Sequence, residues 1–189
     1  MPIVAALLPL IAFVYLFAGL FVLAARKPAY SHVLHTISEI GEVGAPDQRL
    51  VAWGMFAPIG LAFLPGAIML QTAAPAVAAL CVCIAVGYLV AAIFPCDPGS
   101  PVSGSARQGM HNLGGAVEYI GGGLALLAAA KTFDEPFRIA GYVVLGVAVG
   151  LTVLPAGAPR GLLQRIGETV LFGSAAWLVW LAAGRIGAV

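Results

Sequence analysis

The sequence between Phe94 and Glu118 places the ionisable side chains Asp97, His111 and Glu118 in or beside strongly apolar segments. Asp97 belongs to a Cys-Asp-Pro-Gly turn, whereas His111 and Glu118 belong to the apolar segment that follows it. Ionisable residues inside a bilayer are costly and are generally kept for function. A carboxyl group and an imidazole at such positions could exchange protons, hold the polar group of a ligand or bind a metal ion.

His111 and Glu118 are predicted to face the same way. In a helix they share one face with Gly114 or Gly115 and with Gly122, because these positions follow a period of about 3.6 residues. The helical rise of about 1.5 Å per residue places Glu118 about 10 Å deeper in the membrane than His111. We expect Glu118 to face a bundle interior, where an unpaired carboxyl group keeps its proton. A structural hydrogen bond between helices is the simpler alternative.

The first hypothesis for this chemistry is a metal site. His32 and His35 are spaced one helical turn apart, and with Asp97 and His111 they supply ligand types that suit zinc or another divalent metal. Such a site with a bound water would make the chain a metal-dependent membrane hydrolase. The alternative is that His32 and His35 are solvated residues at the membrane interface.

The second hypothesis is a polar pocket at one membrane interface that binds a lipid-like amphiphile, without a cofactor. We assign His111 and Glu118 to its wall, Asp97 and Glu39 to its rim, and Arg107 to contact with an anionic head group. Other basic residues on the same side could help to hold a phosphate, or could be ordinary topology anchors: Arg26, Lys27, Arg160 and Arg165.

Two further hypotheses do not require a ligand pocket at the membrane interface. Glu118 and His111 could serve a small proton-linked transporter, although the chain is short and has no clear inverted repeat. The chain could instead be an accessory subunit of a larger membrane complex or form a homo-oligomer, which requires no site chemistry. Simple structural roles also exist for two local motifs. Asp97-Pro98-Gly99 suits a β-turn, and Glu168 could pair with Arg165 along a helix.

The elements that must position these residues are membrane helices. The chain is 61% hydrophobic and 9% charged, whereas soluble domains carry roughly 25% charged residues. Its net charge is +1 and it has no basic run, so nothing indicates nucleic-acid binding. The 189 residues suit one domain, an all-α integral membrane bundle of six transmembrane helices. The predicted segments are Pro2–Ala25, Leu50–Leu70, Pro75–Pro95, Gln108–Ala130, Phe137–Pro155 and Leu162–Gly184.

Six spans place both termini on one side of the membrane. The opposite side holds the loops 26–49, 96–107 and 156–165, which carry six of the nine Lys and Arg residues. The positive-inside rule therefore predicts a cell-membrane protein with cytoplasmic loops and extracytoplasmic termini. In the first loop we expect a short interfacial helix over Ser31–Ile40 and a capping box formed by Thr36 and Glu39.

Two loop motifs resemble a known family. His35-Thr-Ile-Ser-Glu-Ile-Gly41, and Phe94-Pro-Cys-Asp-Pro-Gly99 followed by His111, resemble a family of six-span bacterial membrane proteins of unknown function, which is distantly similar to the Frag1/DRAM/Sfk1 group. Members commonly have Ser-Asp-Leu-Gly where this chain has Ser-Glu-Ile-Gly. The resemblance implies no reaction, and the lipid association of the related group favours the amphiphile only by analogy. The family-pattern positions are Ser38, Glu39, Gly41, Asp97, Gly99 and His111.

Overall fold

The computed structural model describes residues 2–155 and 157–187, and every regular element within them is helical. Six helical stretches there are long and apolar enough to cross a membrane. Their ends lie within three residues of the predicted ones, so the all-α fold with six such helices is confirmed. The stretches are Ile3–Ala24, Leu50–Leu70, Pro75–Ile93, Ala106–Phe133, Glu135–Val153 and Arg160–Arg185.

Two of these stretches contain a π-helical part. The second span is η2 (Leu50–Phe56) followed by α2 (Ala57–Leu70), and the fourth is α4 (Ala106–Ala116), η3 (Val117–Gly121) and α5 (Gly122–Phe133). Short π segments inside helices are frequently found at functional sites, and η3 carries Glu118. The other spans are single helices: α1 (Pro2–Ala24), α3 (Pro75–Ile93), α6 (Glu135–Val153) and α7 (Arg160–Arg185).

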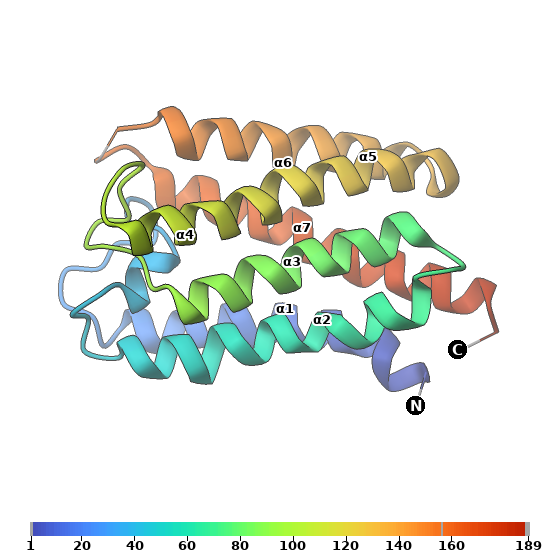
Figure 1. Cartoon of the computed structure of the whole chain (residues 1–189), viewed down its shortest axis with the longest axis horizontal. Coiled ribbons are helices and arrows are strands. Elements are labelled where there is room, and N and C mark those ends of the chain that lie inside the picture. The colour runs from blue at the N-terminus through green and yellow to red at the C-terminus, as the bar shows by residue number, and fades with distance from the viewer. Residues whose placement is uncertain (1, 156, 188–189) are drawn as a thin grey trace.

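The six spans pack side by side as a bundle. Neighbours in the chain pair closely, α2 with α3 and α5 with α6, while α1 packs along α7. Figure 1 shows the start of α1 and the end of α7 at one end of the bundle, with the three long connections at the other end. Fully buried side chains such as Phe63, Ile84 and Phe172 fill the space between the helices.

The interfacial helix predicted over Ser31–Ile40 is wrong. Turns occupy its first half, and only a short 3₁₀ helix, η1 (Ser38–Gly41), follows. The reason is local competition for backbone donors: the Ser31 amide donates to His35 Nδ1 at 2.9 Å, and the Thr36 amide donates to Glu39 Oε1 at 2.7 Å. The second of these bonds is the predicted capping-box contact, which is therefore present without the longer helix.

Candidate functional site

A cavity of about 620 Å³ opens among α3, the fourth span, α6 and the start of α7, on the side of the long connections. Its wall changes character along its length. The polar end is lined by Thr36, Ser38, Ser100, His111, Asn112, Arg160 and Gln164, and Glu118 and Tyr119 lie deeper. The remaining wall is mostly apolar, formed by Ala91, Val102, Ala116, Ile120, Leu145, Ala148, Val149, Leu151 and Val153.

His111 is held in one orientation at the polar end. Its Nδ1 lies 2.9 Å from the Phe94 carbonyl oxygen, and its Nε2 lies 3.0 Å from Ser38 Oγ. A carbonyl oxygen only accepts hydrogen bonds, so Nδ1 must carry a proton and donate it. In the neutral ring Nε2 then accepts from the Ser38 hydroxyl. Both ring nitrogens are engaged, and the imidazole presents a fixed polar edge to the cavity.

Arg160 is a buried cation at the same end, only 9% exposed. Its Nη2 donates to the Ser100 carbonyl oxygen at 2.8 Å, but its buried Nε has no partner within the described residues. Within the described residues, no carboxylate oxygen lies within 4 Å of the Arg160 guanidinium nitrogens. A buried charge normally has a counter-charge, so Arg160 gives this end of the cavity a net attraction for anions.

Close packing of α7 on the first loop positions Arg160. The Gly161 and Leu162 amides donate to the Leu34 and Val33 carbonyl oxygens at 3.3 and 2.9 Å, which satisfies donors that a helix start leaves free. A Cβ at Gly161 would lie 2.2 Å from the His35 carbonyl oxygen. Only glycine allows this approach, which brings the first turn of α7 against the loop.

Arg165 strengthens the same junction. Its guanidinium group donates to the His35 carbonyl oxygen at 3.1 Å and to the Tyr30 hydroxyl at 2.8 Å, and its Nη2 lies 3.0 Å from His32 Nδ1. Burial and the neighbouring Arg165 charge lower the pKa of His32. The predicted helical pair between Arg165 and Glu168 is wrong, because Arg165 turns to the loop while Glu168 turns to the bundle interior.

The deep end of the cavity contains a second carboxyl group beside Glu118. Glu118 and Glu168 are 6% and 1% exposed, and their carboxyl groups lie close to one another. The Tyr119 hydroxyl donates to Glu168 Oε1, and the buried Tyr88 side chain lies close to Glu168. Glu118 therefore faces the interior as predicted, on the same buried face as His111 and Gly114.

A family model described as "Protein of unknown function (DUF998)" matches residues 10–184. The chain belongs to this family. The matched range covers every residue that lines the cavity and also Glu168. No curated protein and no solved structure matches the chain.

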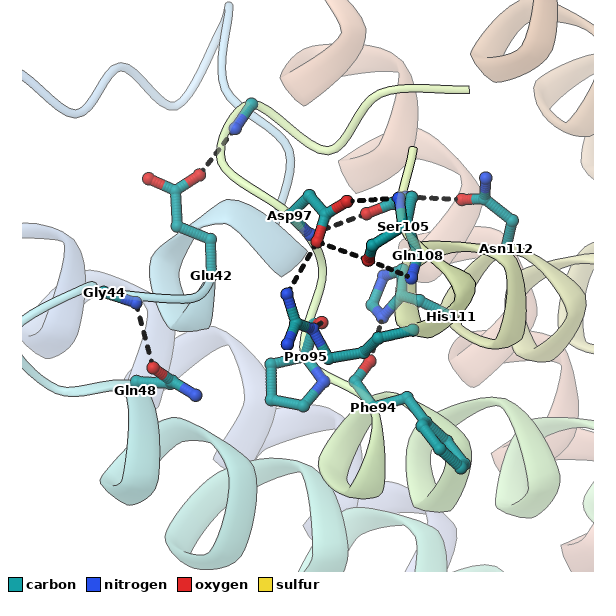
Figure 2. A network of polar contacts seen from close by, with 12 residues as sticks. Glu42, Gly44, Gln48, Phe94, Pro95, Asp97, Ser105, Gln108, His111 and Asn112 are labelled. Carbon is teal, nitrogen blue, oxygen red and sulfur yellow. Dashed lines mark hydrogen bonds and ion pairs between the residues drawn. The ribbon is translucent and has the colours of Figure 1, made fainter. Parts of the chain in front are cut away.

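Asp97 and Arg107 form an ion pair outside the cavity wall of this DUF998 protein. Asp97 Oδ1 accepts from Arg107 Nη2 at 2.8 Å and from Ser105 Oγ at 2.8 Å, and its Oδ2 accepts from the Ser105 amide at 2.8 Å. Figure 2 shows these bonds joining the loop to the start of α4. Hydrogen bonds from the Ser105 amide and from Arg107 lower the pKa of Asp97. The pair thus fixes the loop that ends at the cavity.

The predicted turn at Asp97 is confirmed. The Ser100 amide donates to the Asp97 carbonyl oxygen at 2.9 Å, and Gly99 has a φ of +77°. Proline followed by a glycine with positive φ is typical of a type II turn. Gln108, which is fully buried, accepts from the Asp97 amide at 2.7 Å and holds the turn against α4.

Glu39, predicted on the rim, also lies outside the cavity wall. Its Oε1 accepts from the Thr36 amide and hydroxyl at 2.7 and 3.0 Å, so it organises the loop that presents Thr36 and Ser38 to the cavity. Of the five predicted ligand contacts, His111 and Glu118 line the cavity, whereas Asp97, Glu39 and Arg107 support the loops around it.

The four predicted metal ligands do not come together. Within residues 2–155 and 157–187, no three His, Cys, Asp or Glu side chains are grouped as a metal ion would require. His35 Nδ1 accepts from the Ser31 amide, His32 faces Arg165, and His111 bonds to Phe94 and Ser38. The turns that replace the predicted interfacial helix remove the regular spacing on which the grouping depended.

Sequence reasoning missed one residue of the site and did not single out another. Glu168 was assigned to a local pair, and Arg160 was only one of several basic residues that could hold a phosphate or act as topology anchors. A signal for Glu168 is nevertheless present, because it is a carboxyl group well inside the last apolar segment. No comparable signal marks Arg160, whose importance depends on the loop carbonyls that it meets in space.

Proposed function

We propose that this membrane protein binds an amphiphile with an anionic head group, with the head at Arg160 and the apolar part between α4 and α6. The observation that carries the proposal is the cavity itself. One continuous space of about 620 Å³ joins a buried arginine without a carboxylate partner in the described chain to a long apolar wall. Ligand sites typically have volumes of about 300–1,000 Å³ and a few fixed polar groups on mostly apolar walls.

Fixed polar side chains line the same end of the cavity as Arg160. Asn112 Nδ2 donates to the Val102 carbonyl oxygen at 2.8 Å, and Gln164 Oε1 accepts from the Ile37 amide at 2.7 Å. Together with Ser38, which is bonded to His111, these side chains give the polar end fixed dipoles. A phosphate is the best fit, because arginine binds its oxygens with strong, directional hydrogen bonds.

The apolar wall supports binding of a hydrocarbon chain. α6 packs closely on α5 and η3 but hardly touches α4, so the fourth span and α6 diverge towards the loop side. Val149 and Val153 on α6 and Ile120 on η3 line the cavity while being substantially exposed. In a bilayer such side chains face lipid, so an acyl chain could enter sideways without leaving an apolar environment. The family that the two loop motifs resemble is expected to be distantly similar to the Frag1/DRAM/Sfk1 group, whose association with lipids favours this proposal by analogy only.

For the orientation we propose the cell membrane, with cytoplasmic loops and extracytoplasmic termini. The cavity would then open on the cytoplasmic leaflet, whose anionic lipids attract basic residues. The surplus of Lys and Arg on the loop side supports this arrangement. Cysteine labelling from either side of intact cells, at residue 28 and at residue 134, would test it.

The test of binding is native mass spectrometry of the purified chain after mild delipidation. Phosphatidylglycerol is compared with a diacylglycerol that has the same acyl chains and no phosphate. Arg160→Gln should weaken phosphatidylglycerol retention about tenfold to hundredfold, because hydrogen bonds to charged groups contribute about 1.5–3 kcal/mol. Diacylglycerol retention should change little.

Arg49→Gln is the matched control, since Arg49 is exposed on the same side and does not line the cavity. It removes the same charge and should leave retention unchanged. A thermal unfolding curve for each variant separates lost binding from lost folding. Equal loss of retention in both variants, or no retention of phosphatidylglycerol by the wild-type chain, would refute the proposal.

A further inference from the structure

Two carboxyl groups meet at the deep end of the cavity without a neutralising cation. Glu118 Oε1 and Glu168 Oε2 are buried and have no protein hydrogen-bond donor in the described chain. Glu118 lines the cavity, and Glu168 lies behind it in contact with Tyr119 and Tyr88. Two buried carboxyl groups therefore lie close together, and each has one oxygen without a donor among the described residues. Glu118 belongs to the π-helical segment η3.

The polar groups around this pair come from α3, η3 and α7. α3 contributes Tyr88 and Cys83, η3 contributes Tyr119, and Gln164 of α7 is a neighbour of Tyr119. α6 faces the cavity at this depth with apolar residues such as Leu145 and Ala148. Within the described residues, none of the ion pairs includes Glu118 or Glu168. Hydroxyl, thiol and amide groups can orient the carboxyl groups, but they do not neutralise two negative charges.

Two carboxylates in contact cannot both be ionised in a water-poor site, because like charges repel strongly at low dielectric. A single proton between them removes the repulsion. It also supplies the missing donor, since a protonated carboxyl donates to its unprotonated neighbour, as in other carboxyl pairs that share one proton. The Tyr119 hydroxyl then donates to the carboxyl group that remains ionised.

Gly87 on α3 is shaped to this arrangement. A Cβ at that position would lie 2.5 Å from Glu118 Oε2 and 2.6 Å from Glu118 Cβ. The absence of a side chain allows the Glu118 carboxyl to lie against the backbone of α3. The position of Glu118 beside the cavity therefore depends on a glycine at residue 87.

We propose that Glu118 and Glu168 form a binding site for one shared, exchangeable proton, and that this site couples the occupancy of the cavity to protonation. The second half rests on the proposed function. An apolar chain in the cavity would displace water from Glu118 and disfavour the doubly ionised pair. Ligand binding should therefore retain the proton, and affinity should fall as the pH rises far enough to remove it.

Infrared spectroscopy tests the proton without any ligand. The wild-type chain at neutral pH should show a protonated carboxyl C=O stretching band that shifts in D₂O. Glu118→Gln places an amide donor where the shared proton was, so Glu168 becomes an ordinary carboxylate and the band should disappear. The double variant Glu118→Gln/Glu168→Gln should also lack it. Glu135→Gln, at the exposed start of α6, is the matched control and should keep the band.

Absence of the band in the wild type, or its persistence in the double variant, would overturn the proton site. Persistence in Glu118→Gln alone would assign the proton to Glu168 and overturn sharing. If the band appears only when sodium is removed, the carboxyl pair binds a sodium ion in place of the proton, which would also overturn the proton site. Size-exclusion profiles confirm that each variant is folded, and Glu118→Gln remains decisive if the double variant is not.

Lipid retention as a function of pH tests the coupling. Between about pH 7 and about pH 10, wild-type affinity for phosphatidylglycerol should fall at least about fivefold, the lower end of typical coupling between sites. In the double variant this dependence should be lost. Equal affinity at both pH values would overturn the coupling. Failure to bind at either pH, with the infrared result as expected, would refute the proposed function and the coupling but support the proton site.

Discussion

Replacing Gly161 by alanine should destabilise the bundle and disorganise the polar end of the cavity. The added Cβ would lie 2.2 Å from the His35 carbonyl oxygen and 2.8 Å from the His32 carbonyl oxygen. A carbon to oxygen contact normally needs about 3.3 Å, so the loop must move away by roughly 1 Å. Both obstacles are backbone atoms, which cannot rotate out of the way as a side chain can.

The cost can be worked out from the contacts that move. Overpacking a tight site costs about 1–3 kcal/mol. The His35 carbonyl oxygen also accepts from Arg165 Nη1 at 3.1 Å, and loosening a hydrogen bond to a charged group costs up to about 1.5–3 kcal/mol. We therefore expect Gly161→Ala to lose about 2–5 kcal/mol of unfolding free energy.

Denaturant unfolding in detergent micelles measures this loss, and Gly173→Ala is the matched control. Gly173 lies in the same helix with open space around the position of a Cβ, so alanine there should be neutral or stabilising by up to about 1 kcal/mol. A Gly161→Ala chain that unfolds within about 0.5 kcal/mol of the wild type would refute the reasoning. An equal loss of unfolding free energy in both variants would show that alanine destabilises α7 at any position, and not specifically at its junction with the first loop.

Two predictions concern pH. Hydrogen bonds from the Ser105 amide and from Arg107 lower the pKa of Asp97 in the folded chain. The contribution of Asp97 to stability should therefore be lost as the pH falls below the ordinary aspartate range. Acid unfolding should show this loss in the wild type and not in Asp97→Asn. Burial raises the pKa of Tyr30 to about 12, so stability should fall as the pH rises from about 10 towards that value. Alkaline unfolding of Tyr30→Phe should lack this fall, and at neutral pH the variant should lose about 1–3 kcal/mol with the bond to Arg165.

The helices and one face of the site could be predicted because their physical causes are local. Runs of about 20 apolar residues must form helices in a bilayer, since no other open structure satisfies the backbone there. The 3.6-residue period then brings His111 and Glu118 to one face. Asp97, Pro98 and Gly99 are adjacent in the chain, and their conformational preferences alone specify the turn.

Glu168 shows where local reasoning fails. A partner three residues away, Arg165, is sterically allowed on any helix, and nothing within α7 excludes the pair. The choice depends on Tyr30 and the His35 carbonyl, which lie 130 or more residues earlier and attract Arg165 to the loop. Glu168 instead lies in the bundle interior, where it accepts from Tyr119 and lies close to Glu118.

The sequence by itself determined that this is a multi-pass membrane protein of six helices with buried ionisable residues, because length, apolarity and period are properties of each segment alone. Only the tertiary structure decided which polar groups meet: Arg160 at the mouth of a cavity, Glu168 against Glu118, and Asp97 with Arg107 outside it. The physical reason is that these meetings depend on how separate helices and loops pack. Gly161 lets α7 approach the backbone of the first loop, and Gly87 lets the Glu118 carboxyl approach α3. The position of a glycine in the sequence does not show which group will pack against it.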